Sequence, residues 1–314
     1  MTQNKSLTGH LSAFLTILIW GTTFISTKVL LKNFSPIEIL FIRFLIGYAA
    51  LWLVSRKRLT PRSSTHEIYF LLAGLCGVSL YYLLENIALT YTLASNVGVI
   101  ISIAPFFTAL FECIFLKGKR PGLRFFAGFV LAIVGICLIS FGSGDAISIN
   151  PLGDLLAAAA AVVWAAYSTL TKKISSFGYP TIHTTRRTFF YGLLFMIPTL
   201  FIMGFHVTPS QFIDTTNLLN LLFLGLGASA LCFVTWNLAV RVLGSVKTSV
   251  YIYMVPVITT VTSALILHEQ ITAAALCGMA LTLAGLFLSE SKSKKVVPAN
   301  GCTESKTPLQ ADGE

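Results

Sequence analysis

Among the ionisable side chains inside the long apolar stretches of this 314-residue sequence, four are the sharpest candidates for chemistry. They are Arg43, Glu85, Glu112 and Arg187. A charged group in the middle of a lipid bilayer costs at least about 2.5 kcal/mol, so each one needs a partner or a water-filled site. We expect Glu85 to pair with Arg43, and Glu112 to pair with Arg187. Two interpretations stay open: structural ion pairs that orient helices, or a carboxylate that takes up and releases protons.

A second group of side chains follows helical spacing in the same stretches. Thr16, Trp20, Thr23 and Thr27, for example, share one face of a helix over residues 11–31. Lipid-facing surfaces have no use for such side chains, so they should face protein or an internal cavity. The candidates for binding a small molecule are Trp20, Thr23, Tyr82, Asn86, Ser102, Trp164, Tyr167, Trp236, Asn237 and Tyr253. Simple helix packing is the alternative, above all for the small hydroxyl residues.

Two prolines fall in the middle of apolar stretches, at Pro105 and Pro256. Each removes a backbone donor and leaves a carbonyl one turn earlier without its helical partner. Such breaks are tolerated in a membrane where neighbours or water satisfy the backbone. We interpret both as hinge or gate positions, with packing kinks as the alternative.

The composition decides which elements can position these residues. Hydrophobic residues make up 55% of the chain and charged residues 11%, and the mean hydropathy is +0.80. Soluble domains carry about 25% charged residues, so a soluble enzyme and a disordered chain are both excluded. The net charge of +10 is scattered in short clusters, which argues against a nucleic-acid partner. The six cysteines show no CxxC pairing, so we expect no metal site and no cofactor.

Ten apolar stretches are each long enough to cross the hydrocarbon core as a helix of about 20 residues. They cover residues 11–31, 34–54, 68–90, 94–116, 122–142, 152–174, 180–204, 217–240, 245–267 and 271–289. The sequence therefore predicts an all-α integral membrane protein with ten transmembrane helices. Most lysines and arginines fall on one side if the N-terminus is cytoplasmic, so both termini are predicted to be cytoplasmic in a multi-pass protein of the cell (plasma or inner) membrane.

Residues recur at nearly constant offsets along the chain. Trp20, Lys28, Pro36 and Arg43 return 144 positions later as Trp164, Lys172, Pro180 and Arg187. Asn86 and Pro105 return 151 positions later as Asn237 and Pro256. The pattern predicts two five-helix repeats over residues 1–145 and 146–290, followed by a disordered cytoplasmic tail over 291–314. Because five is odd, the second repeat enters the membrane from the opposite side, as in many secondary transporters.

Several of these segments resemble a known family. Residues 87–95 (IALTYTLAS) lead into 103–110 (IAPFFTAL), and 236–244 (WNLAVRVLG) lead into Met254-Val-Pro256 and His268-Glu269. With Trp20-Gly21 and Arg43, they look like the EamA-type family of the drug/metabolite transporter superfamily. The resemblance covers about residues 11–289 and implies a ten-helix exporter of small metabolites that works by alternating access. One departure is Gly118, where the family usually has the glutamate that corresponds to Glu269.

We therefore predict a secondary transporter, not an enzyme, that exports a small amphipathic metabolite such as an amino acid. The sequence has no nucleotide-binding GxxxxGK[ST] loop, HExxH motif or GxSxG motif. The alternatives are a multidrug or nucleotide-sugar transporter of the same fold, or a non-transporting membrane receptor or assembly partner. Expected partners are the substrate, the lipid bilayer and, as a candidate coupling ion, the proton, with Glu112 as the expected coupling carboxylate. No pattern specifies an oligomeric state.

Overall fold

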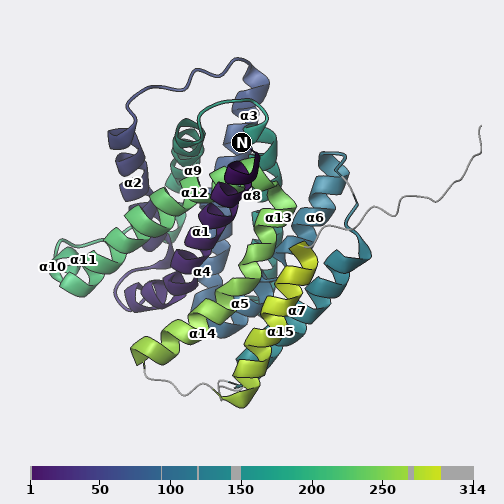
Figure 1. Cartoon of the computed structure of the whole chain (residues 1–314). Coiled ribbons are helices and arrows are strands. Elements are labelled where there is room, and N and C mark those ends of the chain that lie inside the picture. The colour runs from purple at the N-terminus through teal and green to yellow at the C-terminus, as the bar shows by residue number, and fades with distance from the viewer. Residues whose placement is uncertain (1, 93, 119, 143–149, 268–271, 291–314) are drawn as a thin grey trace, which may run out of the picture.

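The computed structural model describes residues 2–92, 94–118, 120–142, 150–267 and 272–290. Helices account for nearly all of this described part, and it contains no strand (Figure 1). In the first half these elements are α1 Thr2–Leu30, α2 Pro36–Val54, α3 Ser64–Gly74, η1 Leu75–Leu80, α4 Tyr81–Tyr91, α5 Ala94–Ile101, α6 Ala104–Phe115 and α7 Leu123–Gly142. In the second half they are α8 Pro151–Ser175, α9 Thr181–Met203, α10 Ser210–Ile213, α11 Thr215–Leu222, η2 Phe223–Leu231, α12 Cys232–Leu243, α13 Ser245–Val250, η3 Tyr251–Tyr253, α14 Met254–Leu267 and α15 Ala273–Glu290. The predicted tail over 291–314 lies outside the described residues.

Seven helical segments of the described chain are long and apolar enough to cross a membrane. They are Ser6–Leu30, Pro36–Val54, Ser64–Tyr91, Val97–Phe115, Pro151–Ser175, Thr181–Met203 and Thr215–Leu243. Two shorter apolar helices, Leu123–Ile139 and Ala273–Ser289, fall on two more of the expected stretches. The all-α membrane fold is confirmed, whereas the expected count of ten is not reached by length and composition alone.

The two mid-span prolines each stand at a break in a helix. Pro105 follows the first residue of α6, after the interruption at Ser102 and Ile103 that ends α5. α14 begins directly after the tight 3₁₀ turn of η3, and Pro256 is its third residue. A proline fixes its own φ and restricts the residue before it, so helices commonly break just ahead of it. The ninth expected stretch, 245–267, is for this reason divided into α13, η3 and α14.

Helices α7 and α15 run antiparallel along each other, as Figure 1 also shows at the edge of the bundle. A Cβ placed on Gly128 would lie 2.6 Å from the Gly285 carbonyl oxygen, and one on Gly135 would lie 2.6 Å from the Gly278 carbonyl oxygen. As residue numbers rise on one helix they fall on the other. These two helices occupy the same place in the two sequence repeats, so their opposed directions agree with an inverted duplication.

A wide π turn occurs at the same place in both repeats, which the hydrophobic pattern did not predict. η1 links α3 to α4, and η2 links α11 to α12. Close to each one a glycine packs on the second helix of the other repeat: a Cβ on Gly74 would lie 2.7 Å from the Thr188 carbonyl oxygen in α9, and a Cβ on Gly225 would lie 2.6 Å from the Ile46 side chain in α2. Such π turns are frequent at functional sites because they re-aim the residues that follow.

Candidate binding site

Three tryptophans from three helices meet in the interior. The ring centroids of Trp20 on α1 and Trp164 on α8 are 5.2 Å apart, and Trp236 on α12 lies 5.1 Å from Trp20 and 5.7 Å from Trp164. Trp164 and Trp236 are almost completely buried. The two tryptophans that the repeat relates, Trp20 and Trp164, are therefore in direct contact across the repeat boundary.

The indole N–H groups of this cluster differ in their partners. Trp20 Nε1 donates to the carbonyl oxygen of Ala228 in η2, at 3.0 Å. The Nε1 atoms of Trp164 and Trp236 are buried and have no hydrogen-bond partner. A buried donor without a partner costs about 1–3 kcal/mol. Either N–H group would therefore gain free energy from a hydrogen-bond acceptor brought within its reach.

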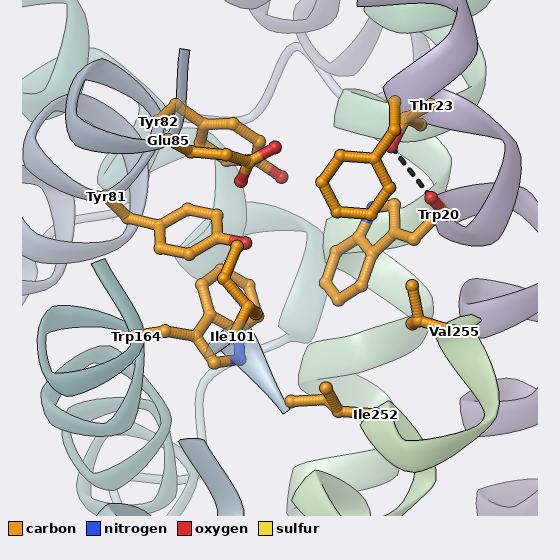
Figure 2. A pocket seen from close by; sticks show the side chains of 10 residues that line it. Trp20, Thr23, Tyr81, Tyr82, Glu85, Ile101, Trp164, Ile252 and Val255 are labelled. Atoms are coloured by element: carbon orange, nitrogen blue, oxygen red, sulfur yellow. Dashed lines mark hydrogen bonds between the residues drawn. The ribbon is translucent and has the colours of Figure 1, made fainter. Parts of the chain in front are cut away.

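A small cavity of about 40 Å³ opens beside Trp20 and Trp164 (Figure 2). It is lined by Trp20, Thr23, Phe24, Tyr81, Tyr82, Glu85, Ile101, Trp164, Ile252 and Val255. We call it the aromatic pocket. Its residues come from both repeats, and Glu85 is the one charged side chain among those described as lining it. The volume has room for about three water molecules, so a larger ligand could enter only if side chains moved.

A second cavity, of about 20 Å³, lies further along α8. Thr171, Ile174, Ser175, Tyr179, Thr181, Thr184, Thr188, Asn237 and Arg241 line it. Trp164 lines the first cavity and Thr171 the second, and seven residues of helix cover about 10 Å. The Tyr167 side chain, fully buried, lies between these positions on α8 and donates to Asn237 Oδ1 at 2.8 Å. Tyr167 and its bond to Asn237 thus lie between the two cavities, and we call this pair the closed layer.

The structure brings together about half of the predicted binding residues. Trp20, Thr23, Tyr82 and Trp164 line the aromatic pocket, together with Glu85, which was expected to pair with Arg43. Trp236 packs against this pocket's two tryptophans, Tyr167 belongs to the separating layer, and Asn237 lines the second cavity.

Five of the predicted binding residues line neither cavity; besides Tyr167 and Trp236 they are Asn86, Ser102 and Tyr253. Asn86 Nδ2 donates to the Pro36 carbonyl oxygen at 3.1 Å. Ser102 Oγ donates within its own helix to the Gly98 carbonyl oxygen at 2.8 Å. Tyr253 is fully buried in a separate apolar cluster with Phe125 and other residues. All three side chains are fully buried among helices, as the packing alternative expects, although Asn86 Oδ1 and the Tyr253 hydroxyl have no hydrogen-bond partner.

Five pocket residues were not among the predicted ones. Phe24, Ile101, Ile252 and Val255 are apolar and look like any lipid-facing or core residue in the sequence. Tyr81 carried a usable signal, because it precedes Glu85 by four positions and so shares its helix face.

The predicted pair of Arg43 with Glu85 is wrong. No salt bridge joins these two described side chains. Arg43 Nε donates instead to Ser229 Oγ at 3.0 Å, and its guanidinium carbon lies 4.5 Å from the centre of the Tyr82 ring. Tyr82 precedes Glu85 by about one turn of α4, so the arginine reaches the aromatic ring and the hydroxyl of η2 and not the carboxylate.

The predicted pair of Glu112 with Arg187 is also wrong. Arg187 forms a salt bridge with Glu67 of α3, and Tyr191 donates to the same carboxylate. Glu112 accepts a hydrogen bond from Ser245 at the start of α13, and it lines neither cavity. The sequence could not decide which helix ends adjoin. Glu67 was not among the candidates because it lies one residue before the third stretch, 68–90.

A largely buried site shared by two helical halves of a polytopic membrane protein is the arrangement that membrane transporters with inverted repeats use. The chain belongs to the EamA-like transporter family, whose sequence model matches residues 7–141 and 151–290. It is a membrane transporter, as the resemblance in the sequence implied. His268 and Glu269, which carried part of that resemblance, lie outside the described residues.

Named relatives match almost the whole chain. A protein described as an uncharacterized transporter of Archaeoglobus fulgidus is 31% identical over 90% of this chain and 97% of its own length. A probable terminal-alkyne amino-acid exporter of Streptantibioticus cattleyicolor is 28% identical over 87% of this chain and 90% of its own. A probable amino-acid metabolite efflux pump of Escherichia coli is 26% identical over 88% and 93%. A solved crystal structure with 21% identity, covering 90% of this chain and 96% of that chain, has a TM-score of 0.72, which concerns the fold alone.

Proposed function

We propose that this protein is a secondary exporter of a small amphipathic metabolite of the amino-acid type, and that the aromatic pocket binds it. One observation carries this proposal: a pocket with aromatic walls and a single lining carboxylate is built from both repeats. Aromatic faces accept the apolar portion of such a substrate, and the carboxylate accepts hydrogen bonds from its polar portion. The printed names of the Streptantibioticus cattleyicolor and Escherichia coli relatives, which mention amino acids, favour the same substrate class.

In this proposal, transport requires the closed layer to open on one side of the substrate while a new barrier forms on the other side. In the alternating-access scheme the site opens first to one side and then to the other, by movement of one repeat against the other. The layer around Tyr167 would part on the side of the second cavity while the aromatic pocket closes. Pro105 and Pro256, which break their helices at equivalent places, are the proposed hinge or gate positions.

The wider arrangement in the cell is part of the same proposal. We infer that the two repeats span residues 1–145 and 146–290, that residues 291–314 form a disordered cytoplasmic tail, and that both termini are cytoplasmic in the plasma or inner membrane. Protons are the proposed coupling ion. No cofactor and no catalytic step enter this scheme.

Reconstituted liposomes test the function directly. Purified protein in liposomes should release preloaded labelled aromatic or branched amino acids with saturable kinetics. The test variant is Trp164→Ala, which removes one wall of the aromatic pocket and should raise the half-saturating concentration. Absence of saturable flux for every amino acid in a pool would contradict the proposal.

The alternatives predict different results in the same liposomes. A nucleotide-sugar carrier needs cationic groups for its phosphates, whereas the aromatic pocket offers a carboxylate among its described lining residues. A multidrug transporter would move bulky hydrophobic dyes in competition with one another. A receptor or assembly partner would move none of these compounds. Such a protein would have no need of two small cavities separated by a closed layer.

A further inference from the structure

We infer that the aromatic pocket is a subsite for a positively charged nitrogen, so that the substrate is recognised through an ammonium group and needs no carboxylate of its own. This inference rests on the proposed function for its transport meaning, and it can be tested by binding alone. It narrows the substrate class from amphipathic metabolites in general to organic amines, with amino acids as one kind.

The first observation is the placement of Glu85. Its side chain is 5% exposed and points from α4 toward α1 into the pocket (Figure 2). It forms no salt bridge with any other described residue. The Tyr81 side chain lines the same pocket, and the Arg43 guanidinium is held by Ser229 Oγ instead of the carboxylate. Acceptor positions on the carboxylate therefore remain for a ligand N–H.

The second observation is the set of rings around that carboxylate. Trp20, Phe24, Tyr81, Tyr82 and Trp164 line the same small cavity. The faces of aromatic rings carry negative electrostatic potential and attract cations, and several rings around one site form the aromatic cages that bind ammonium ligands. The Tyr81 ring lies 4.7 Å from Tyr82 and 4.7 Å from Trp164, so these walls are held by one another.

The third observation is the size of the cavity. About 40 Å³ is too small for a whole amino acid but sufficient for a group about as large as a few water molecules. A primary or methylated ammonium group has this size. We therefore place only the charged nitrogen in the cavity, with the rest of the substrate beside Trp164, which lines the cavity and whose indole N–H has no partner.

The inference also explains why Glu85 and Arg43 are not paired. A substrate ammonium would have to displace a bonded arginine from the carboxylate, at the cost of leaving a buried charge alone. Here Arg43 is held aside by Ser229 and by the face of Tyr82. The Glu85 carboxylate therefore remains free to bind a substrate ammonium reversibly.

A series of phenyl compounds that differ in charge provides the probes. We would measure binding to the purified protein through quenching of tryptophan fluorescence, since three of the four tryptophans form the cluster. Protonated phenethylamine and benzyltrimethylammonium are cations. L-Phenylalanine is zwitterionic, 2-phenylethanol is neutral and 3-phenylpropanoate is an anion. We expect the two cations to bind at least about tenfold more tightly than the alcohol, and the anion not to bind.

A matched pair of variants locates the effect. Glu85→Gln keeps the shape of the side chain and removes its charge, and should weaken phenethylamine about tenfold while the affinity for 2-phenylethanol changes little. Glu112→Gln makes the same change at a carboxylate that accepts from Ser245 and lines neither cavity, and should leave both affinities unchanged. If Glu85→Gln does not fold, Glu85→Asp and the wild-type charge series test the same point.

The outcomes separate this inference from the proposed function. Equal affinities for the amine and the alcohol, or an unchanged amine affinity in Glu85→Gln, would overturn the ammonium subsite, even if the liposomes still move amino acids. Charge-selective binding that depends on Glu85 would support the subsite, even if no amino acid is transported.

Discussion

At the scale of single residues, the structure changes which carboxylate can be involved in coupling. The sequence favoured Glu112 because it shares a helix face with Ser102 and Pro105. In the structure Ser102 is bonded within its own helix, and Glu112 is held by Ser245 outside both cavities. Glu85 lines the aromatic pocket, so it is the carboxylate that the proposed substrate would meet.

The first prediction compares these two carboxylates in transport. In liposomes with an imposed proton gradient, Glu85→Gln should abolish gradient-driven accumulation, because only a carboxylate inside the pocket can exchange a proton for the substrate. Glu112→Gln should accumulate substrate as the wild type does. Rates with and without the gradient are the measurement. A loss confined to Glu112→Gln would return the coupling role to Glu112.

The second prediction concerns Tyr167, which separates the two cavities. Tyr167→Phe keeps the ring but leaves Asn237 Oδ1 without its 2.8 Å donor. We expect the stability to fall by about 1–3 kcal/mol while the layer stays closed to solute. Tyr167→Ala removes the ring as well and should let solute leak down its gradient without saturation. Efflux from preloaded liposomes distinguishes the two variants. Equal, saturable efflux from both would mean that the ring is no barrier.

At the scale of elements, the π turns allow helices of opposite repeats to approach closely. Next to η1 in one repeat and in η2 of the other, glycines lie against the second helix of the partner repeat. η1 also brings Gly77 onto α8, where a Cβ would lie 2.2 Å from the Tyr167 ring. The turn that widens the third span thus sets the position of the closed layer.

The third prediction concerns the effect of adding a methyl group at the contact between Gly77 and Tyr167. Gly77→Ala should cost about 1–3 kcal/mol, because the new Cβ overpacks against a ring that cannot move away without breaking its bond to Asn237. Thermal unfolding in detergent should therefore occur at a lower temperature, and transport should fall. Gly122→Ala is the control, since a Cβ there meets nothing within 4 Å. Equal melting temperatures for the two variants would show that α8 yields readily.

Helix starts illustrate how local sequence sets the ends of elements. Ser35 caps α2 in a capping box with Glu38, and Pro36 takes the first helical turn, where it needs no donor. Asn150 caps α8 without a capping box, since its side chain accepts from the Gly153 N–H. These positions are the Ser-Pro and Asn-Pro dipeptides of the sequence. The starts of α2 and α8 follow from them with no need of tertiary contacts.

At the scale of the whole molecule, the two repeats are intertwined and do not form separate bodies. α1 packs along α12, and α4 along α8, so that the first and third spans of each repeat contact the other repeat. α7 and α15 form a further contact between the repeats at the edge of Figure 1. The aromatic pocket exists only where these contacts meet, and neither repeat contains it alone.

The fourth prediction concerns orientation in the membrane. In a chain without its native cysteines, single cysteines at positions 57 and 173 should react with an impermeant thiol reagent applied from the cytoplasmic side. Cysteines at 32 and 150 should react only from the outside. The reason is the bias of lysine and arginine toward cytoplasmic loops. Reaction of positions 57 and 173 from the outside would invert the proposed topology.

The sequence by itself determined the class of the molecule. Long apolar stretches with few charges allow only membrane-spanning helices, because lipid leaves backbone groups no other partner. The offset between recurring residues disclosed the duplication, and the prolines marked the broken helices at Pro105 and Pro256. All of these are properties of a stretch of chain read alone, so no knowledge of its neighbours was required.

Only the tertiary structure decided which side chains meet. Neither predicted ion pair forms: Arg43 contacts Ser229 and Tyr82, and Arg187 forms a salt bridge with Glu67. A periodic pattern gives the face of a helix on which a residue lies, but the partner depends on how helices are rotated and shifted against each other. A π turn alters that rotation for every residue after it, and nothing in the hydrophobic pattern records it. For this reason Glu85 could be identified as a buried acid from the sequence, whereas its place in an aromatic pocket shared by two repeats emerged only from the packing of the helices.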